Sequence, residues 1–238
     1  MVGARLGVRS VQYLGAVRGS IRRRWMTFGG RPRKAYLTVK QMSGERHGAK
    51  QPDRFDPARA AILDDPARFG YVPVEVLLAM LELPDGGTLV DFGAGTGLYA
   101  LEIARRRPDL RVVALDEQAQ MLAHVRAAIA RSGLVNVEAV SPDASVSLMG
   151  RANGVLALNV LHELGDRALA EVRALLADGG RVAFVDWSAD VDRPVGPPRD
   201  HVYGVAEATD RLVRAGFGVV ERPTLAYHYA LVATAERT

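Results

Sequence analysis

Short apolar runs alternate with longer amphipathic stretches along most of the chain. Five apolar runs predict strands, and they cover residues 88–92, 111–116, 135–140, 154–160 and 181–187. Apolar positions at helical spacing predict helices over residues 74–83, 96–107, 117–132, 166–177 and 203–215. Strands that are apolar throughout and separated by helices are typical of a parallel sheet covered on both faces. The pattern therefore predicts a three-layer α/β fold.

The C-terminal pattern differs, because two apolar runs follow each other directly. Residues 219–226 and 227–235 predict two strands with almost no connection between them. Such strands must pair antiparallel, because a parallel pair needs a crossover of a dozen or more residues. We therefore expect one reversed strand near the C-terminus. Ahead of the first helix, residues 52–73 predict a short helical lead-in that prolines interrupt.

A glycine-rich loop joins the first predicted strand to the next helix. Gly93, Gly95 and Gly97 leave room for a ligand against the backbone and the helix N-terminus. The dinucleotide fingerprint requires glycine or alanine three residues after its second glycine, and this chain has Leu98 there. The carboxylate of Asp91, just before the loop, would repel a pyrophosphate but attract a ligand with ammonium and sulfonium groups. The alternative is a tight turn in which Asp91 only caps the helix.

Two more aspartates follow predicted strands. Asp116 ends the second strand, 19 residues beyond Gly97, where an acidic residue can bind ribose hydroxyls. Asp143 comes shortly after the third strand. Ligands of open parallel sheets bind outside the carboxyl ends of the strands, so we expect Asp91, Asp116 and Asp143 to share one site.

Charge is divided unevenly along the 238 residues. Residues 1–50 hold 12 basic side chains and one acidic side chain, a net charge of +11, whereas residues 51–238 have a net charge of −7. We expect a basic, disordered or weakly helical extension over residues 1–50 and one folded domain over residues 51–238. The extension fits a transit peptide, a surface-binding arm, or translated upstream sequence before a start at Met26 or Met42. The acidic body argues against a domain that coats nucleic acid.

The composition excludes several other kinds of protein. The absence of cysteine excludes a disulfide scaffold, a cysteine-ligated zinc site and a thiol nucleophile. The five histidines have no paired spacing, so no metal site is predicted. No apolar stretch approaches the roughly 18 residues of a membrane span. We expect a cytoplasmic protein, or an imported one if the extension is a transit peptide.

These motifs together resemble the class I S-adenosylmethionine-dependent methyltransferases. The resemblance runs from about Asp53 to Ala233 and rests on DFGAGTG, LDEQAQML, SPDA, NVLHEL and LLADGGRVAFVDW. The chain is similar overall to the small-molecule branch that includes the ubiquinone and menaquinone biosynthesis methyltransferases. This family's fold is a Rossmann-like, mostly parallel seven-stranded sheet with one antiparallel strand near the C-terminus, which agrees with the strand pattern.

The resemblance also implies which residues hold the cofactor, S-adenosyl-L-methionine. Asp91 and the loop would bind the methionine part, Asp116 the ribose hydroxyls and Asp143 the adenine amino group. Glu117 and Gln118 replace apolar or small residues common in the family, and Met121 is a candidate substitute for adenine packing. The implied set is Asp91, Gly93, Ala94, Gly95, Thr96, Gly97, Asp116, Glu117, Met121, Asp143, Ala144, Asn159 and Leu161.

Methyl transfer from a sulfonium needs little more than alignment of donor and acceptor, and a base only when the acceptor loses a proton. His162 and His201 are the candidate bases. His162 lies in NVLHEL, and His201 follows a long proline-rich loop. Each has an alternative: His162 as a capping or supporting histidine, and His201 as an ordinary loop residue.

The expected acceptor is a small organic molecule, methylated on oxygen or carbon, or on nitrogen. Asn159 is followed by Val160, Leu161 and His162, whereas nucleic-acid amino-methylating enzymes of this fold have Pro-Pro and an aromatic residue there. Two alternatives stay open. One is a nucleic-acid methyltransferase that uses the basic extension as an arm. The other is an inactive protein that binds S-adenosylmethionine. The sequence does not predict the oligomeric state.

Overall fold

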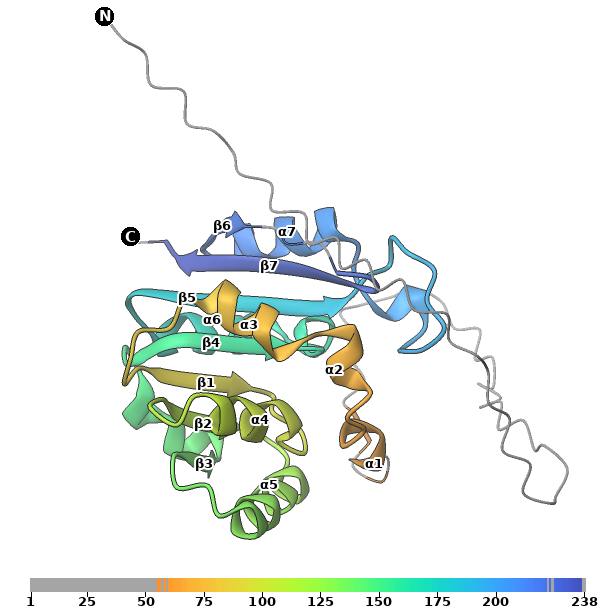
Figure 1. Cartoon of the computed structure of the whole chain (residues 1–238). Helices are drawn as coiled ribbons and strands as arrows, with labels where there is room; N and C mark the ends of the chain where they lie inside the picture. Colours follow the sequence, from red (N-terminus) through yellow and green to blue (C-terminus); the bar gives the residue numbers. More distant parts are fainter. Residues whose placement is uncertain (1–54, 57, 59, 222, 224, 237–238) are drawn as a thin grey trace, which may run out of the picture. The chain divides into compact units, whose positions relative to one another are not determined.

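The computed structural model describes residues 55, 56, 58, 60–221, 223 and 225–236 (Figure 1). The predictions for the basic extension, residues 1–50, concern residues outside this set. In the described part, seven strands form one sheet in the order β3-β2-β1-β4-β5-β7-β6. The strands are β1 Thr88–Phe92, β2 Arg111–Leu115, β3 Val137–Val140, β4 Ala152–Leu158, β5 Leu176–Trp187, β6 Phe217–Glu221 and β7 His228–Ala235.

The sheet has one reversed strand, as the sequence predicts. β3, β2, β1, β4 and β5 pair in parallel, whereas β7 runs antiparallel to both β5 and β6. β7 lies between β5 and β6, so the last two strands form a hairpin that adds to the sheet through its second strand. The predicted three-layer, Rossmann-like fold is therefore confirmed.

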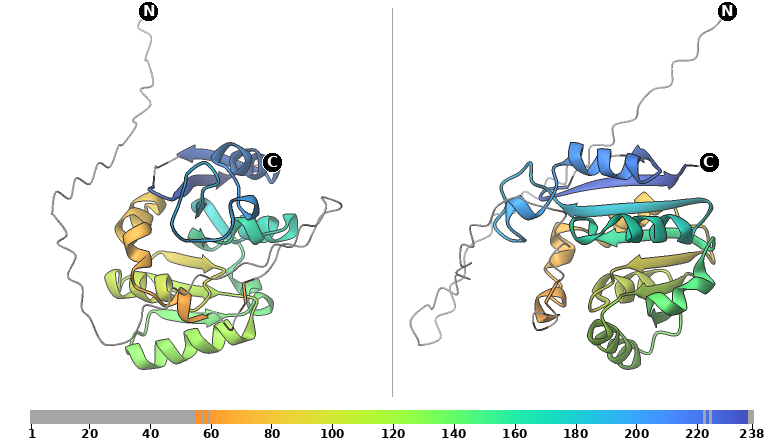
Figure 2. Two further views of the ribbon diagram at one scale, coloured as in Figure 1. Left: turned by 90° about the vertical axis from the view of Figure 1, so that its right-hand side faces the viewer. Right: turned by 180° about the vertical axis from the view of Figure 1, so that it is seen from behind.

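Helices cover both faces of the sheet (Figure 1 and Figure 2). One core joins the sheet to the first longer helices through Leu77, Ile103 and Val125. The other joins it to α6 and α7 through Leu169 and Leu212. The helices are α1 Ala60–Leu63, α2 Arg68–Tyr71, α3 Val74–Leu81, α4 Leu98–Arg106, α5 Ala119–Ser132, α6 Asp166–Leu175 and α7 Val205–Arg214. Short 3-10 turns are η2 Pro142–Leu148, η3 Leu161–Glu163 and η4 Arg199–His201.

Most element boundaries differ from the sequence prediction by a few residues, and two of the differences have a clear structural reason. α4 begins two residues late because Gly97 is left-handed, with φ +82°. β5 begins at Leu176, inside the predicted helix over residues 166–177, because Leu176 already pairs with Ala152. The ladder then shifts register before Gly154 pairs with Arg181. Gly180 is required in this bulge, since a Cβ there would lie 2.7 Å from the carbonyl oxygen of Ala152.

The parallel strands end at one edge of the sheet. Phe92 pairs with Leu115, Leu115 with Val140, and Leu158 with Val185. The turns that follow these strands therefore meet at this edge, which is where ligands of open α/β sheets bind. No helix among the described residues is both long enough and apolar enough to cross a membrane.

Candidate functional site

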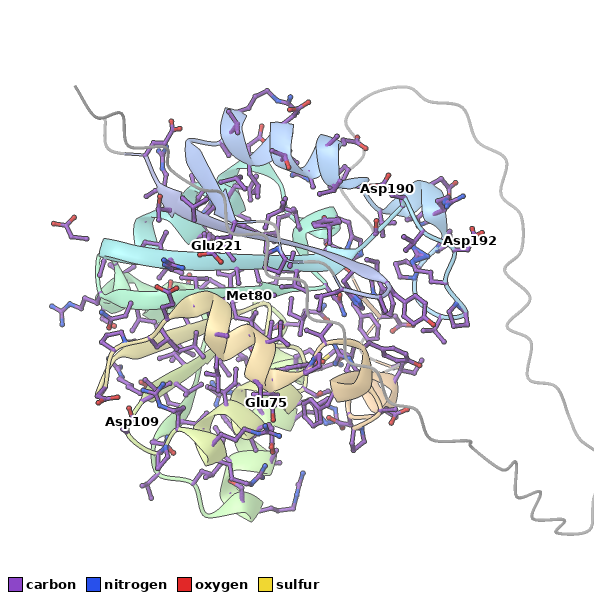
Figure 3. All side chains as sticks on the ribbon, turned by 45° about the horizontal axis from the view of Figure 1, so that its top comes forward. Glu75, Met80, Asp109, Asp190, Asp192 and Glu221 are labelled. Carbon is purple, nitrogen blue, oxygen red and sulfur yellow. The ribbon has the colours of Figure 1, made fainter. Side chains whose placement is uncertain are left out.

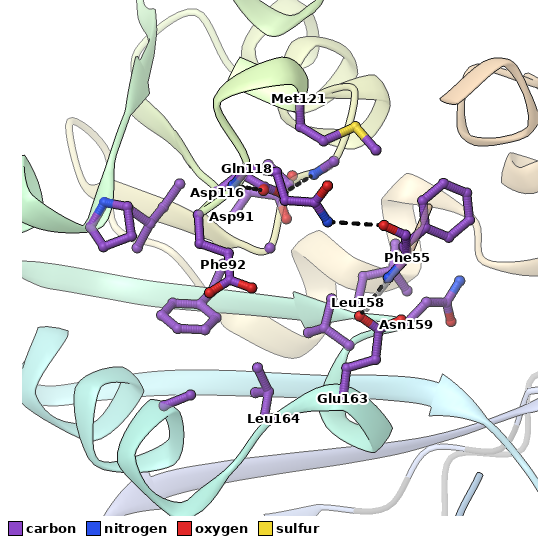
Figure 4. A pocket seen from close by; sticks show the side chains of 18 of the residues that line it. Phe55, Asp91, Phe92, Asp116, Gln118, Met121, Leu158, Asn159, Glu163 and Leu164 are labelled. Atoms are coloured by element: carbon purple, nitrogen blue, oxygen red, sulfur yellow. Dashed lines mark hydrogen bonds between the residues drawn. The ribbon is translucent and has the colours of Figure 1, made fainter. Parts of the chain in front are cut away.

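A cavity of about 600 Å³ opens at the carboxyl ends of β1, β2 and β4 (Figure 4). This volume lies within the roughly 300–1,000 Å³ that small-molecule sites occupy. The glycine loop after β1 forms one wall, and residues of the lead-in, α5, η2 and α6 complete it. The lining carries the carboxyl groups of Asp91, Asp116, Glu117, Glu163 and Glu171. Such a lining favours a cationic ligand.

The glycine loop brings bare backbone to the cavity. Gly93 and Gly95 have φ angles of +74° and +57°, a region that side chains rarely adopt. A Cβ on Gly93 would lie 2.7 Å from Cγ1 of Val160, and one on Gly95 would lie 3.0 Å from Cδ1 of Leu63. The backbone N–H groups of Gly93 and Ala94 donate to the carbonyl oxygen of Leu115, which ties the loop to β2. The loop is thus a cradle that has no room for a side chain at Gly93 and little room at Gly95.

Asp91 lies at the base of this cradle and is 3 % exposed. Burial raises the pKa of its carboxyl group to about 7, although the positive charge of Arg68 opposes the shift. The negative charge of Asp116 raises the pKa further. Burial disfavours the charged form of Asp91, so a cationic ligand would stabilise the ionised carboxylate.

Arg68 of α2 lines the cavity beside Asp91, although it is not among the residues predicted from the sequence. Its Nη1 donates to the carbonyl oxygen of Leu63 at 2.7 Å, and its guanidinium lies 5.3 Å from the ring centroid of Tyr99. The Tyr99 hydroxyl donates in turn to the carbonyl oxygens of Arg68 and Val72. These contacts fix the guanidinium of Arg68 beside the buried carboxyl group of Asp91. Together the two side chains can bind one amino acid, Asp91 through its ammonium group and Arg68 through its carboxylate. No local pattern marks Arg68, since it belongs to a four-residue helix.

Asp116 follows β2 and is fixed by two backbone donors. Its Oδ2 accepts from the N–H of Gly95 at 2.8 Å, and its Oδ1 accepts from the N–H of Gln118 at 2.8 Å. Burial raises the pKa of this carboxyl group, while the two N–H donors lower it. Asp116 thus bridges the glycine loop and the start of α5, with lone pairs left for a hydroxyl ligand.

The lead-in crosses the cavity mouth at Phe55 (Figure 4). Nε2 of Gln118 donates to the Phe55 carbonyl oxygen at 3.1 Å. The Phe55 N–H donates to Oε2 of Glu163 at 3.4 Å. Gln118, which departs from the family pattern, therefore holds the lead-in across the ends of β2 and β4. The sequence indicates that the lead-in, residues 53–83, can cover a small pocket, but it does not predict the contacts of Phe55 with Gln118 and Glu163.

The other expected cofactor residues divide into two groups. Ala94, Glu117, Met121 and Asn159 line the cavity with Asp91, Gly93, Gly95 and Asp116. Asn159 has φ +58°, and its Oδ1 is buried without a hydrogen-bond partner in the described structure. Thr96, Gly97, Asp143, Ala144 and Leu161 do not line it. Asp143 and Ala144 are exposed on η2, where their neighbours Pro142 and Ser145 face the cavity instead, and Leu161 is buried in the core.

The two candidate bases lie in different settings. Nδ1 of His162 lies 2.8 Å from Oδ2 of the fully buried Asp186, and its Nε2 lies 3.6 Å from Oε1 of Glu163. Burial lowers the pKa of His162, but the hydrogen bond and charge of Asp186 and the charge of Glu163 together raise it more, so the net pKa is raised. His162 is outside the cavity lining, whereas Glu163 is part of it. His201 is exposed on η4 and does not line the cavity.

Comparisons with known proteins point mainly to methyltransferases. Residues 89–180 match the family model described as a methyltransferase domain. A solved S-adenosylmethionine-dependent methyltransferase from Aquifex aeolicus is 27 % identical, with a TM-score of 0.70 over 76 % of this chain and 98 % of its own. The trans-aconitate 2-methyltransferase of Azoarcus sp. is 33 % identical over 50 % of this chain and 46 % of its own length. The ribosomal RNA small subunit methyltransferase G of Mycobacterium leprae is 33 % identical over 58 % of this chain and 52 % of its own.

The chain spans about half or less of the length of these curated relatives, which act on both small molecules and RNA by name. The matched region includes β1 from its second residue, the glycine loop, β2, β3 and β4, and with them Asp91, Asp116 and Asn159. The glycine cradle thus lies within the matched residues, whereas β6 and β7 follow them. Residues 89–180 therefore match a methyltransferase domain, and the sheet that contains them has the fold of an S-adenosylmethionine-dependent methyltransferase.

Proposed function

We propose that this domain transfers the methyl group of S-adenosylmethionine to a small organic acceptor, on oxygen or carbon, with nitrogen as the alternative atom. The observation that carries the proposal is the buried Asp91 beside Arg68, at the base of a glycine cradle that leaves no room for a side chain at Gly93. An amino acid with a neighbouring positive charge matches this arrangement, because its ammonium complements Asp91 and its carboxylate complements Arg68.

The residues of the cavity fit the rest of the cofactor. Asp116 keeps lone pairs for ribose hydroxyls, and Met121 offers a buried apolar surface at the start of α5. The unpartnered Oδ1 of Asn159 can accept from the cofactor's ammonium group. When bound, S-adenosylmethionine supplies a methyl group on a sulfonium that an acceptor atom can displace in line.

The chain's own contribution to the reaction is placement and, for a hydroxyl acceptor, removal of a proton. Asp186 already accepts from the backbone N–H groups of His162 and Trp187, so Nδ1 of His162 is the donor in their side-chain pair. The other ring nitrogen, Nε2, is then left as the proton acceptor. We assign the role of general base to this nitrogen.

A small acceptor is favoured by the strap at Phe55. Both main-chain polar groups of Phe55 bond to side chains on opposite sides of the cavity mouth, which narrows access for a polymer. Among the relatives, the trans-aconitate enzyme is by its name a small-molecule methyltransferase.

Calorimetric titration tests the cofactor assignment. We expect the full-length protein to bind S-adenosylmethionine but not NAD. Replacement Asp91→Asn should weaken the first interaction by about 10- to 100-fold, the equivalent of one charge-assisted hydrogen bond. The matched control is Asp85→Asn, because the Asp85 side chain is fully exposed and lies outside the cavity. Equal effects of the two substitutions would contradict the assignment.

A methylation screen tests the acceptor class. The protein should release S-adenosylhomocysteine with one or more small acceptors, in a reaction that His162→Asn slows. Methylation of RNA or protein, with no small molecule methylated, would reject the proposal.

The second candidate, a ribosomal RNA methyltransferase, is favoured by the relatives of that name and by the net charge of +11 over residues 1–50. RNA binding that falls steeply with salt and is lost on deletion of residues 1–44 would support it.

A further inference from the structure

An aromatic cluster lies beyond the carboxyl end of β5, outside the cofactor cavity. It consists of Tyr71 at the end of α2, Trp187 at the end of β5, Tyr227 just before β7 and His228 at the start of β7. The rings of Trp187 and His228 are 4.0 Å apart between centroids and inclined by 31°. The Tyr71 ring lies 6.3 Å from that of Trp187 and 5.8 Å from that of Tyr227. Side chains from three separate elements thus meet beside the site.

The cluster and the His162–Asp186 pair lie on opposite faces of the sheet. Trp187 pairs with His228 across the antiparallel strands, and Asp186 pairs with Tyr229. Adjacent residues of a strand point to opposite faces, so Trp187 and His228 share the face of α3, and Asp186 shares the face of α6. The charges of Asp186, Arg68 and Arg193 all act on His228. The aromatic cluster and the His162–Asp186 pair therefore lie on the two sides of the end of β5, next to the turn after β4 that lines the cavity.

His228 has hydrogen-bonding capacity that the described structure does not use. Its side chain is 4 % exposed, and neither Nδ1 nor Nε2 has a partner. Burial lowers the pKa of His228 to about 4, so its ring is neutral near pH 7. A neutral imidazole offers one donor and one acceptor, which matches a hydroxyl group. A buried polar group without a partner is costly, so a ligand that bonds to it gains affinity.

The segment after β5 covers Trp187. Arg193 lies 5.6 Å from a ring centroid of Trp187, and its own Nε is buried without a partner. Gly196 has φ +101°, and a Cβ there would lie 2.9 Å from Cδ2 of Trp187. Figure 3 shows this segment, with Asp190 and Asp192, beyond the carboxyl end of β5. The segment is tied at its base, where Oδ2 of Asp190 accepts from the N–H of Val205 at 2.8 Å.

We infer that this cluster is the acceptor subsite, and that the acceptor is a flat aromatic compound with a ring hydroxyl. The aromatic ring packs on Trp187 in place of Arg193 and Gly196, and a ring hydroxyl hydrogen-bonds to His228 as a recognition contact. Because His228 and His162 lie on opposite faces of the sheet, this hydroxyl is not the one that His162 would deprotonate. That the bound compound is a methyl acceptor rests on the proposed function, whereas recognition of the ring and hydroxyl rests on the cluster alone.

Binding to the full-length protein saturated with S-adenosylhomocysteine tests this inference without any methyl transfer. The probes are 2-naphthol, naphthalene and decahydro-2-naphthol, which separate the contributions of ring and hydroxyl. We expect 2-naphthol to bind about 10-fold more tightly than either other probe. Naphthalene lacks the hydrogen bond and decahydro-2-naphthol lacks the aromatic contact, and losing either contact typically weakens binding by about this factor. His228→Phe should remove the preference for 2-naphthol over naphthalene, His228→Gln should retain part of it, and Trp187→Leu should weaken binding of both aromatic probes.

His124→Phe is the matched control, since His124 is exposed on α5, and it should leave all three affinities unchanged. Every variant should bind S-adenosylhomocysteine as the wild type does, which shows that it has folded. Equal affinity for 2-naphthol and decahydro-2-naphthol, or an unchanged preference in folded His228→Phe, would overturn the inference. If the wild-type protein did not bind S-adenosylmethionine, that result would instead contradict the proposed function.

Discussion

Nδ1 of His162 lies 2.8 Å from Oδ2 of Asp186, so a side chain in the turn after β4 is oriented by a carboxylate near the end of β5. Asp186 has no exposed surface and also accepts from the N–H groups of His162 and Trp187. The carboxylate is thus held from three directions. This arrangement fixes the ring plane and the tautomer of His162, and it leaves Nε2 toward Glu163.

Removal of the His162 ring should slow catalysis without affecting the cofactor. For a hydroxyl acceptor, His162→Asn should lower kcat about 100-fold or more, the usual contribution of a general base. Affinity for S-adenosylmethionine should stay within about twofold, because His162 does not line the cavity. Initial rates of S-adenosylhomocysteine release measure the first quantity and calorimetry the second. His124→Asn, on the exposed face of α5, should change neither.

The same pair predicts a pH profile. Burial lowers the pKa of His162, but Asp186 and Glu163 together raise it more, so the pKa lies above the ordinary histidine value of 6.5. Because the base is the neutral form, kcat should rise with pH, with its midpoint above 6.5. In Asp186→Asn the midpoint should move down, because the charge that holds the proton is gone. An unchanged midpoint in that variant would show that another group controls the profile.

Cofactor binding should release a proton from Asp91. The pKa of this carboxyl group is about 7 in the free domain, against an ordinary value of 3.8. Because the folded-state pKa is raised, the stability that protonated Asp91 contributes is full below pH 3.8 and is lost as pH rises through about 7. An ammonium ligand requires the ionised form, so affinity for S-adenosylmethionine should rise with pH up to about 7. Titration at pH 6 in buffers of different ionisation enthalpy measures the released proton, and Asp91→Asn should abolish the release.

Alanine substitutions at two left-handed glycines can distinguish the cost of backbone strain from the cost of a steric clash. Gly93 and Gly133 have φ angles of +74° and +69°, but of the two only Gly93 has an atom within 4 Å of where a Cβ would lie, namely Cγ1 of Val160 at 2.7 Å. Gly133→Ala should therefore cost about 1 kcal/mol of unfolding free energy from the left-handed backbone alone. Gly93→Ala should cost more and should also weaken cofactor binding. Denaturant unfolding and calorimetry measure both, and equal losses in the two variants would contradict this account.

Arg211 of α7 positions the turn that carries His162. Its Nη1 donates to the carbonyl oxygen of Leu161 at 3.1 Å, and its Nη2 donates to that of Leu164. Arg211→Met should lower kcat about 10-fold through misplacement of His162, and cofactor affinity should change little. Arg211→Lys should recover part of the rate, since one of the two bonds can be remade. Arg214→Met, exposed one turn later, is the control and should be silent in both measurements.

The sequence by itself determined the alternation of strands and helices, the reversed strand, the glycine loop and the positions of Asp91 and Asp116. These features depend on neighbours within a few residues, because periodicity and turn chemistry report local burial and local backbone shape. Only the tertiary structure decided that Arg68 stands beside Asp91, that Phe55 is held by Gln118 from 63 residues away, and that His162 meets Asp186 from 24 residues away. It also turned Asp143 toward solvent and Leu161 into the core, although both follow strands that end at the site. Such pairings arise because separate strands end at one edge of the sheet and because packing fixes the direction of each side chain. Local sequence periodicity reports neither the order of the strands in the sheet nor the direction that packing gives a side chain.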